Sequence, residues 1–287
     1  MNIEQKIQLL KPHAHLLSSN LMGIEKEGLR VSEKGGLSQA SHPSSLGCAL
    51  THPNITTDFS ESLLELVTPP LSSAKSVLDF LKDTQHYLYC RLPKDQSFWP
   101  ASMPCVMRDK TYIPIAQYGS SNRGKMKTVY RQGLANRYGS VMQVIAGIHF
   151  NYSFSEKFIE KLCAVSINHH NKDEAYMALI RNLERYGWIV TYLFGASPAV
   201  CKSFLNGYHQ HSLVEFNDST LYEPYATSLR MGDIGYQNLR GDEAGVKANY
   251  NSLSHYVHSL KSGMATTCNE HEKLGIKVDG EYQQLNT

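Results

Sequence analysis

One short segment carries two carboxylates at the spacing of a β-strand. Residues 23–31 read GIEKEGLRV. Because successive side chains of a strand point to opposite faces, Glu25 and Glu27 would share a face that is otherwise apolar. Two carboxylates in such a place repel each other unless a cation lies between them, and Mg²⁺ is bound by carboxylates together with substrate phosphates. The alternative is a solvated strand face on which both glutamates are ordinary surface groups.

A second segment places a carboxylate inside an apolar run. Residues 57–68 read TDFSESLLELVT, and an ionised Glu65 would be costly to bury there unless it were paired or bound to a metal. If the segment is one strand, Glu61 shares the face of Glu65, whereas Asp58 needs a bend or bulge to join them. An amphipathic helix with Asp58 and Glu65 turned outward is equally open. Together, the two acidic segments favour a metal site over two solvated surfaces.

Polar side chains also interrupt a third apolar segment, residues 140–154, whose β-branched and aromatic residues predict an extended conformation. Gln143, His149 and Asn151 have the same parity and would share one face of a strand. Polar groups in that position suggest hydrogen bonds to a ligand. A single core histidine is more often structural, so a purely structural role for His149 stays open.

Two further patterns concern anion binding. Residues 119–125, GSSNRGK, match the start of a P-loop, but Met126 stands where Ser or Thr must bind Mg²⁺, so a Walker ATPase is rejected. The cations of the helix expected over residues 122–138 either face solvent or bind an anionic substrate or nucleotide. Arg230, set between apolar residues, suits recognition of a carboxylate, and a structural ion pair with Asp233 is equally open.

These segments require a mixed set of helices and strands to position them. Hydrophobic spacing predicts helices over residues 1–17, 73–92, 122–138, 173–194 and 244–264, and strands over residues 22–31, 57–68 and 140–154. Asp279-Gly280 marks a hairpin near the end. Because helices and strands do not alternate regularly, we expect an α+β fold with an antiparallel sheet rather than a doubly wound fold. No repeat or linker divides residues 1–287, so we expect a single unit.

Composition excludes several classes of protein. The chain has 287 residues, of which 41% are hydrophobic, with 17 Tyr and 9 Phe, so it is not a disordered chain. A formal net charge of +2 is not that of a dedicated nucleic-acid binder. The six cysteines are widely scattered and fit reduced thiols rather than a zinc site. The sequence begins without a signal-peptide pattern, and its most apolar stretch is too short and polar to span a bilayer. We therefore expect a cytoplasmic protein that binds neither membrane nor nucleic acid.

A series of segments, in order from Gly23 to Tyr236, resembles bacterial glutamate–cysteine ligase of the gammaproteobacterial type. The segments are GIEKEGLRV, ALTHPNITTDFSESLLELVTP, WPASMPC, AQYGSSN, YRQGLANRYG, MQVIAGIHFNYS, YLFGASPAVC and PYATSLRMGDIGY. They cover most of the chain, and their shared order makes the resemblance specific.

The resemblance implies a reaction and a fold. ATP would phosphorylate the γ-carboxylate of L-glutamate, and the amine of L-cysteine would then attack the acyl phosphate, which is the first step of glutathione synthesis. The implied fold is that of glutamine-synthetase-like ligases, in which an antiparallel sheet curls into a funnel with helices outside. Phosphoryl transfer depends mainly on positioning and charge neutralisation, which fits segments rich in carboxylates.

The same resemblance assigns roles to individual residues. The implied Mg²⁺ ligands are Glu25, Glu27, Asp58 and Glu65. The residues implied in cysteine binding are Tyr130, Leu134 and Tyr236 around its side chain and Arg230 at its carboxylate. The residues implied along the path of glutamate and the phosphoryl group are Gln143 and His149.

One departure from the family affects the expected activity. Family members are longer and carry a later Glu-x-Arg segment, which supplies a further metal-binding glutamate and an arginine for substrate glutamate. Because this sequence lacks that segment, we expect a C-terminally truncated funnel that is weakly active or inactive alone. Two alternatives stay open: a related ligase that couples glutamate to another amine, and a non-catalytic chain that binds only substrate or a partner. The sequence does not indicate an oligomeric state.

Overall fold

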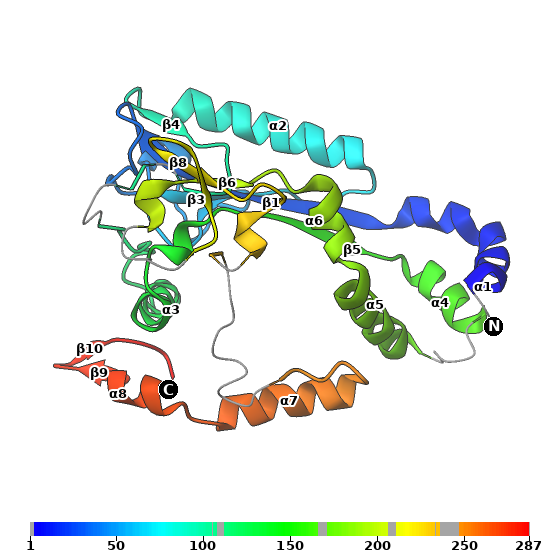
Figure 1. The fold of residues 1–287 in the computed structure, drawn as a ribbon. Helices are drawn as coiled ribbons and strands as arrows, with labels where there is room; N and C mark the ends of the chain where they lie inside the picture. The colour runs from blue at the N-terminus through cyan, green and yellow to red at the C-terminus, as the bar shows by residue number, and fades with distance from the viewer. Residues whose placement is uncertain are drawn as a thin grey trace.

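The centre of the molecule is a five-stranded antiparallel sheet. The computed structural model describes residues 3–104, 106–107, 112–165, 171–205, 211–232, 234–235 and 247–286. The strands of this sheet are β1 (Leu21–Ser32), β2 (Ile55–Thr57), β3 (Leu63–Val67), β4 (Gln96–Phe98) and β5 (Ile148–Ser153). The long strand β1 pairs with β3 along one edge, and with β5 and then β4 along the other. The expected α+β fold with an antiparallel sheet is confirmed (Figure 1).

Helices cover the two faces of this sheet (Figure 1). On one face, α2 (Ala74–Arg91) buries Leu81 and Leu88 against Leu64 and Leu66 of β3. On the other face, a second core forms around Leu29, Leu63 and Phe59. There α3 (Asn122–Tyr138) packs Leu134 and Ala135 against that core. Because residues 27–31 of β1 and most of β3 are buried, the register of the two strands is strongly fixed.

The two helices that cover the sheet begin and end where the sequence predicts. The hydroxyl oxygen of Ser73 accepts a hydrogen bond from Ser76 N at the start of α2, and that of Ser121 accepts one from Gly124 N at the start of α3. Such caps satisfy backbone donors that the first helical turn leaves without partners. Gly139 follows α3 with a φ of 79°, a conformation that glycine adopts without strain.

The single strand expected over residues 57–68 is instead a hairpin. Strands β2 and β3 pair with each other, and residues 58–62 form the turn between them. Glu61 is therefore not on the strand face of Glu65. Its carboxylate is buried and accepts hydrogen bonds from the backbone N–H groups of His42 and Gln117. The bend that Asp58 requires is supplied by this turn.

Other predicted segments also differ from the structure. Within residues 140–154, η3 (Met142–Val144) is a 3₁₀ turn, and only β5 is a strand. The helix expected over residues 173–194 is broken at Gly187 into α5 (Lys172–Tyr186) and α6 (Trp188–Phe194). The first helix is α1 (Ile3–Leu10) followed by η1 (Lys11–Ser19), because Pro12 interrupts the α-helical bonding.

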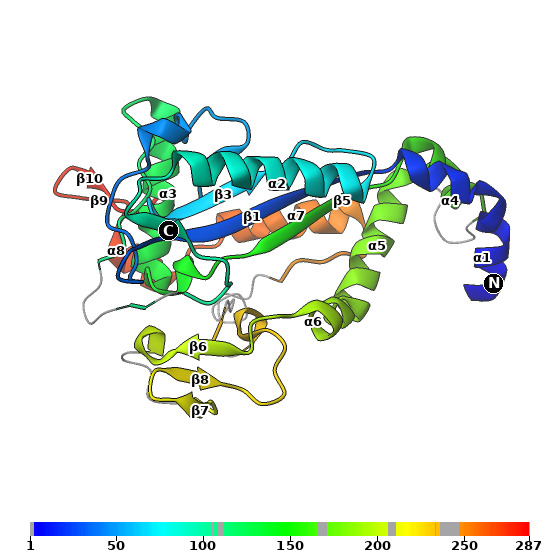
Figure 2. The same ribbon diagram turned by 90° about the horizontal axis from the view of Figure 1, so that it is seen from above.

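The remaining described elements lie around the main sheet. A three-stranded sheet in the order β6 (Ala199–Cys201), β8 (Thr220–Tyr222), β7 (Val214–Asn217) lies apart from it (Figure 2). The other elements are η2 (Ser44–Leu46), α4 (Glu156–Val165), η4 (Lys202–Leu205), η5 (Leu229–Met231), α7 (Leu253–Ala265), α8 (Asn269–Leu274), β9 (Lys277–Val278) and β10 (Glu281–Tyr282). β9 and β10 form the hairpin predicted around Asp279-Gly280. The expected helix over residues 244–264 begins later, at Leu253.

The C-terminal region is tied to α3 by side-chain hydrogen bonds. Gln284 is fully buried, and its amide donates to the carbonyls of His271 and Gly275. Arg137 of α3 donates from Nε to the Gln284 side-chain oxygen at 2.9 Å. Across the described part of the chain, no helix is both long and apolar enough to cross a membrane, and the described cysteines are free thiols.

Substitution at Gly28 tests how tightly this sheet is packed. A Cβ atom at Gly28 would meet the buried ring of Phe98 at 2.2 Å. We predict that Gly28→Ala lowers the free energy of unfolding by about 1–3 kcal/mol, the usual effect of overpacking a core. Urea denaturation measures this. Gly36→Ala is the control, because the added methyl would meet only Val106 O at 3.8 Å. Equal stability of the two variants would contradict the packing described.

Candidate active site on the carboxylate face of the sheet

Two of the predicted carboxylates lie directly opposite each other in the sheet. The register of β1 and β3 pairs Glu27 with Glu65, and Glu25 with Val67. Residues paired in this way point to the same face, and Glu25 shares that face because it is two residues from Glu27. Backbone bonds between β1 and β3 flank the Glu27 pair rather than joining it, an arrangement that brings opposite side chains closest. We refer to this side of the sheet as the carboxylate face.

Asp58 reaches the carboxylate face from the turn between β2 and β3. Burial raises the pKa of its carboxyl group, and the charge of Glu27 raises it further. Arg131 of α3 opposes this effect. Its guanidinium Nε donates a hydrogen bond to the backbone carbonyl of Asp58 and so holds the turn in place. The turn therefore supplies the fourth predicted carboxylate.

The charges of the other three predicted carboxylates all act on Glu65. The pKa of Glu65 is raised from 4.5 to about 7, first by burial and then by the charges of Asp58, Glu27 and Glu25. Such a shift is expected where like charges share a poorly solvated site. Strongly perturbed groups of this kind concentrate at functional sites. The structure therefore brings together the four residues that the sequence proposed as metal ligands.

Neighbouring groups on β5 and at the residue just before it fix the orientation of two of these acids. Glu27 is buried, and its Oε2 accepts a hydrogen bond from Gly147 N at 2.6 Å. Its Oε1 lies 3.0 Å from Nε2 of His149, which donates to it. Asn151 donates from its amide to Glu25 Oε1 at 2.9 Å. His149 is paired with Glu25 in the register, so it lies on the carboxylate face as its parity predicts.

Arg230 lies beside this group of residues through Gly147. A Cβ atom built on Gly147 would meet Nη2 of Arg230 at 2.5 Å and its Cζ at 2.9 Å. The guanidinium therefore packs against the bare Cα of the residue whose N–H bonds to Glu27. This contact between η5 and the entry to β5 places Arg230 next to the carboxylate face, although about 80 residues separate the two segments in the chain.

The structure places the other predicted site residues in different surroundings, and not all of them lie on the carboxylate face. Leu134 packs against the apolar cluster that contains Phe59, so it lies close to the Asp58 turn. Tyr130 is half exposed on α3. Gln143 is buried in η3, so it does not share a strand face with His149 as predicted. Tyr236 lies outside the described residues, and so does Asp233, the alternative partner suggested for Arg230.

Some residues of the site were missed or left undecided by the sequence. Arg131 and Lys127 belong to the cationic helix, where the sequence alone could not separate a solvated face from a binding face. In the structure Arg131 is buried, and both cations pack over the ring of Tyr118. Lys127 also lies within electrostatic range of Glu65 and Asp58. No sequence pattern pointed to Gly147, because its role depends on a contact with Arg230, which is distant in the chain.

The donor set of the carboxylate face fits Mg²⁺. All four acids offer hard oxygen ligands, and burial together with the charges of the other three raises the pKa of Glu65, an effect that a bound cation would oppose. Within the described ranges, no three His, Cys, Asp or Glu side chains converge tightly enough to hold a metal ion by themselves. Mg²⁺ is commonly held by one or two carboxylates while substrate phosphates and water complete its shell. An Mg²⁺ ion held by two of these acids, with phosphate and water completing its shell, therefore fits the structure better than an ion surrounded by protein ligands alone.

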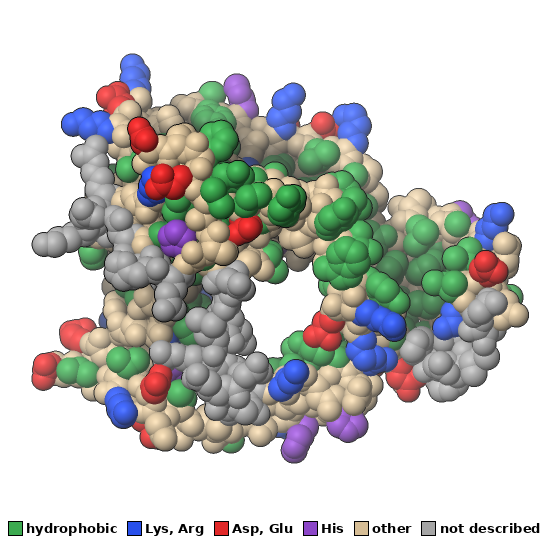
Figure 3. Space-filling view, in the orientation of Figure 1, with side chains coloured by type: hydrophobic (Ala, Val, Ile, Leu, Met, Phe, Trp, Pro, Cys, Tyr) green, Lys and Arg blue, Asp and Glu red, His purple; other side chains and the backbone are tan. Residues whose placement is uncertain are grey.

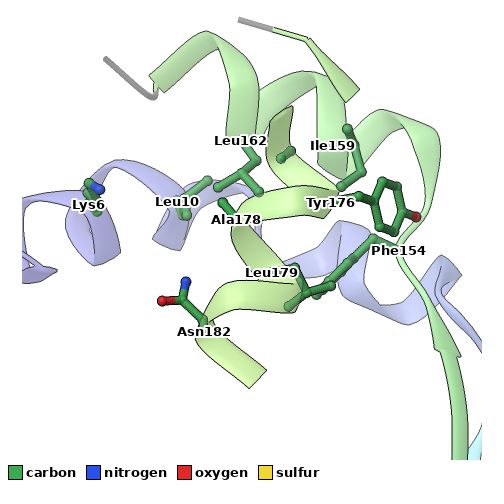
Figure 4. A pocket seen from close by; sticks show the side chains of 10 residues that line it. Lys6, Leu10, Phe154, Ile159, Leu162, Tyr176, Ala178, Leu179 and Asn182 are labelled. Carbon is green, nitrogen blue, oxygen red and sulfur yellow. The ribbon is translucent and has the colours of Figure 1, made fainter. Parts of the chain in front are cut away.

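A separate cavity of about 220 Å³ lies between α1, α4 and α5 (Figure 4). It is lined mainly by apolar side chains, among them Leu10, Phe154 and Leu179, with Lys6 and Asn182 adding polar groups. None of the predicted site residues lines it. This cavity is therefore separate from the carboxylate face.

An antiparallel sheet that gathers carboxylates beside a histidine and arginines is typical of enzymes that handle metal ions and phosphate groups. Comparison with known proteins gives the family. The family model for glutamate-cysteine ligase matches residues 7–287. The chain belongs to the glutamate–cysteine ligase family.

Individual relatives agree with this assignment. The chain is 48% identical over 289 residues to glutamate–cysteine ligase of Pseudomonas putida strain W619, which covers 99% of this chain and 54% of the relative. It is 47% identical to glutamate–cysteine ligase of Hahella chejuensis, which covers 97% of this chain and 53% of the relative. The chain therefore spans about half the length of the curated relatives it matches.

Solved structures give the same fold. A crystal structure of glutamate–cysteine ligase from Francisella tularensis in complex with AMP matches with a TM-score of 0.84 and 36% identity, covering 93% of this chain and 52% of that one. A bifunctional glutathione synthetase from Pasteurella multocida matches with a TM-score of 0.75 and 26% identity, covering 93% of this chain and 33% of that one.

The raised pKa of Glu65 predicts how stability depends on pH. Because the folded protein holds a proton on Glu65 up to about pH 7, whereas the unfolded chain loses it near pH 4.5, the unfolded state binds fewer protons between these values. The free energy of unfolding of the metal-free protein should therefore fall as pH rises from about 4.5 to about 7.

Urea titrations across this pH range measure the effect. Glu65→Gln keeps the shape of the side chain and removes its charge, so it should flatten this part of the profile. Glu160→Gln, at an exposed position on α4, is the matched control and should leave the profile unchanged. A Glu65→Gln profile as steep as that of the unsubstituted protein would contradict the assignment.

Proposed function

We propose that this chain forms the metal-binding and amine-binding side of an active site for ATP-dependent ligation of L-cysteine to the γ-carboxylate of L-glutamate. The observation that carries this proposal is the convergence of Glu25, Glu27, Asp58 and Glu65 on one face of the sheet. The names of the relatives support the reaction, and the AMP complex of the Francisella relative supports an adenine nucleotide as a substrate.

The four carboxylates suit the phosphoryl-transfer half of the reaction. Bound Mg²⁺ would neutralise the charge of the transferring phosphate. Pairs drawn from Glu25, Glu27, Asp58 and Glu65 would hold it, with substrate phosphates and water completing its shell and with β1, β3 and the turn between β2 and β3 as support. His149 and Asn151 keep Glu27 and Glu25 in fixed orientations by hydrogen bonds. Ligand acids held in this way need little reorganisation when the phosphate arrives.

The second half of the reaction needs a bound amine rather than a side-chain nucleophile. The amine of cysteine forms the new amide bond with the γ-carbonyl carbon, and phosphate leaves with the electron pair of the carbon–oxygen bond. Arg230 would bind the α-carboxylate of cysteine through two parallel N–H donors. Tyr130, Leu134 and Tyr236 would surround its side chain. Gln143 and His149 would lie along the path of glutamate and the phosphoryl group.

The setting proposed for this activity is the cytoplasm, where free thiols are maintained. The proposed small-molecule partners are L-glutamate, L-cysteine and ATP with Mg²⁺. Nucleic acid has no proposed role, because the net charge is only +2.

Substitution at Arg230 tests the proposed cysteine site. The assay uses a single-chain chimera in which this chain is followed by the part of the Pseudomonas putida relative that lies outside the matched segment. Arg230→Ala should raise the KM for cysteine about 10- to 100-fold, the effect of losing hydrogen bonds to a charged group, and leave the KM for glutamate nearly unchanged. Gly147→Ala should act in the same direction, because its methyl group displaces the guanidinium.

Arg185→Ala, at an exposed position on α5, is the control and should change neither KM. An unchanged cysteine KM in both Arg230→Ala and Gly147→Ala would contradict the role of Arg230. Replacing cysteine by other amines in the same assay would detect a ligase with a different amine substrate, which would overturn the proposed substrate.

The chain tested alone should make little or no γ-glutamylcysteine. His149, which contacts Glu27, is half exposed, and residues 1–287 contain no Glu-x-Arg segment of the kind that the resemblance implies for the family. Loss of one charge-stabilising group typically lowers a rate about 10²–10³-fold. Phosphate release and product mass can be followed with ATP, Mg²⁺, glutamate and cysteine present. Turnover equal to that of the chimera would show that the described residues suffice.

A further inference from the structure

The Asp58 turn, residues 58–62 between β2 and β3, depends on other segments for its shape. Asp58 is the one predicted carboxylate that a turn rather than a strand carries, so cross-strand pairing does not fix its position. At the base of the turn, Asp58 N donates to Leu63 O at 2.9 Å, and Leu63 N donates to Ser60 O at 3.0 Å. The direction in which the Asp58 carboxylate points is therefore set by whatever holds the rest of the turn.

A segment that we call the strap, residues 114–118, lies along the Asp58 turn. Backbone hydrogen bonds run between the two in both directions: Glu61 N donates to Pro114 O at 2.9 Å, and Ala116 N donates to Phe59 O at 3.0 Å. Phe59 and Ala116 are both buried. Because buried backbone groups keep their hydrogen bonds, the strap holds the turn along its length.

Tyr118, the last residue of the strap, contacts the backbone where the turn begins. It is 5% exposed. Its hydroxyl donates a hydrogen bond to Thr57 O at 2.7 Å and lies 3.1 Å from Asp58 O. The same hydroxyl oxygen accepts a hydrogen bond from Thr57 Oγ1 at 3.0 Å. One hydroxyl group therefore contacts two successive carbonyl groups, and it holds the backbone from which the Asp58 side chain leaves.

The ring of Tyr118 joins the same turn to α3. Lys127 Nζ lies 4.6 Å and Arg131 Cζ lies 4.8 Å from the centre of the ring, distances at which an aromatic ring attracts a cation. The two cations are one helical turn apart and repel each other, so a ring that contacts both offsets that repulsion. Arg131 in turn donates to Asp58 O. Tyr118, Arg131 and the Asp58 backbone thus form a closed set of contacts.

We propose that Tyr118 is a positioning residue that holds the Asp58 carboxylate toward Glu27 and Glu65 by fixing both the backbone of the turn and the place of Arg131. The proposal rests on the metal-binding part of the proposed function, in which Asp58 is a ligand of Mg²⁺. Tyr118 acts through Asp58 rather than on the substrate. A group that orients a metal ligand typically changes metal affinity about 10- to 100-fold when it is lost.

Tyr118→Phe tests this role, because it removes the hydroxyl group and keeps the ring that contacts α3. Mn²⁺ is the probe, since it takes the same oxygen ligands as Mg²⁺ and its unbound form is measured by electron paramagnetic resonance. We expect the Kd of this chain for Mn²⁺ to rise about tenfold, the lower end of the effect of losing an orienting group. An unchanged Kd overturns the proposal, and so does an unsubstituted chain that binds no Mn²⁺.

Tyr152→Phe is the matched control, because it also removes a tyrosine hydroxyl that has a hydrogen-bond partner. Tyr152 accepts from the amide of the buried Asn20, and it is paired with Met22 near the start of β1. Figure 3 shows hydrophobic side chains gathered over the region of β5 and α6, the surface to which its strand belongs. Both substitutions should lower the free energy of unfolding, but Tyr152→Phe should leave the Kd for Mn²⁺ unchanged. An equal rise in Kd for both variants overturns the proposal.

A double-mutant cycle separates positioning from general stabilisation. Asp58→Asn keeps the shape of the side chain and removes its charge, so it should itself weaken Mn²⁺ binding. If Tyr118 acts through Asp58, adding Tyr118→Phe to Asp58→Asn should change the Kd less than about twofold, because coupled residues do not contribute additively. A tenfold effect of Tyr118→Phe in both backgrounds would show that Tyr118 acts independently of Asp58 and overturns the proposal.

Kinetics of the single-chain chimera distinguish this proposal from the proposed function. Tyr118→Phe should raise the Mg²⁺ concentration needed for half-maximal ligase activity about tenfold, with kcat recovering at saturating Mg²⁺ and the KM for cysteine unchanged. An unchanged Mg²⁺ dependence in an active chimera overturns the positioning role and leaves the proposed function standing. A chimera without ligase activity, whose Kd for Mn²⁺ still rises with Tyr118→Phe, supports the positioning role and counts against the proposed function.

Discussion

The repulsion between carboxylates on one face of the sheet is the constraint to which the rest of the structure responds. Glu27 and Glu65 are direct cross-strand partners, a placement that destabilises an ordinary sheet. The surrounding fold holds them there: α2 packs behind β3, and α3 packs on the apolar part of the same face. Arg131 secures the turn that carries Asp58. Such an arrangement keeps the four acids on one face, where a bound cation would offset their repulsion.

Close backbone approaches make this face possible. The bare Cα of Gly147 lets its N–H reach Glu27 while the guanidinium of Arg230 packs on its other side. Gly28 similarly accepts the ring of Phe98 against β1. In both places a side chain would displace a neighbour that the site or the core needs. The proposed metal-binding side and the proposed carboxylate-binding side are thus joined through one glycine.

The parity of a strand was enough to predict that Glu25 and Glu27 share a face, because that relation is local. The register of β3 against β1, which sets Glu65 opposite Glu27, could not be read from either segment alone. Gln143 was misplaced because a 3₁₀ turn precedes β5, where apolar composition suggested a longer strand. The contact between Gly147 and Arg230 joins distant segments, so no local pattern indicated it. The remaining assignments of roles came from the resemblance to the family and stay proposals.

The most direct test of the account is the titration of the Glu65 carboxyl group by carbon-13 NMR, with and without Mg²⁺. We predict an apparent pKa near 7 in the metal-free protein, because burial and three neighbouring acids disfavour the ionised form of Glu65. Saturating Mg²⁺ should lower that pKa, since the ion favours the carboxylate. A pKa near the ordinary 4.5 that Mg²⁺ leaves unchanged would contradict both the convergence of the four acids and their role as ligands.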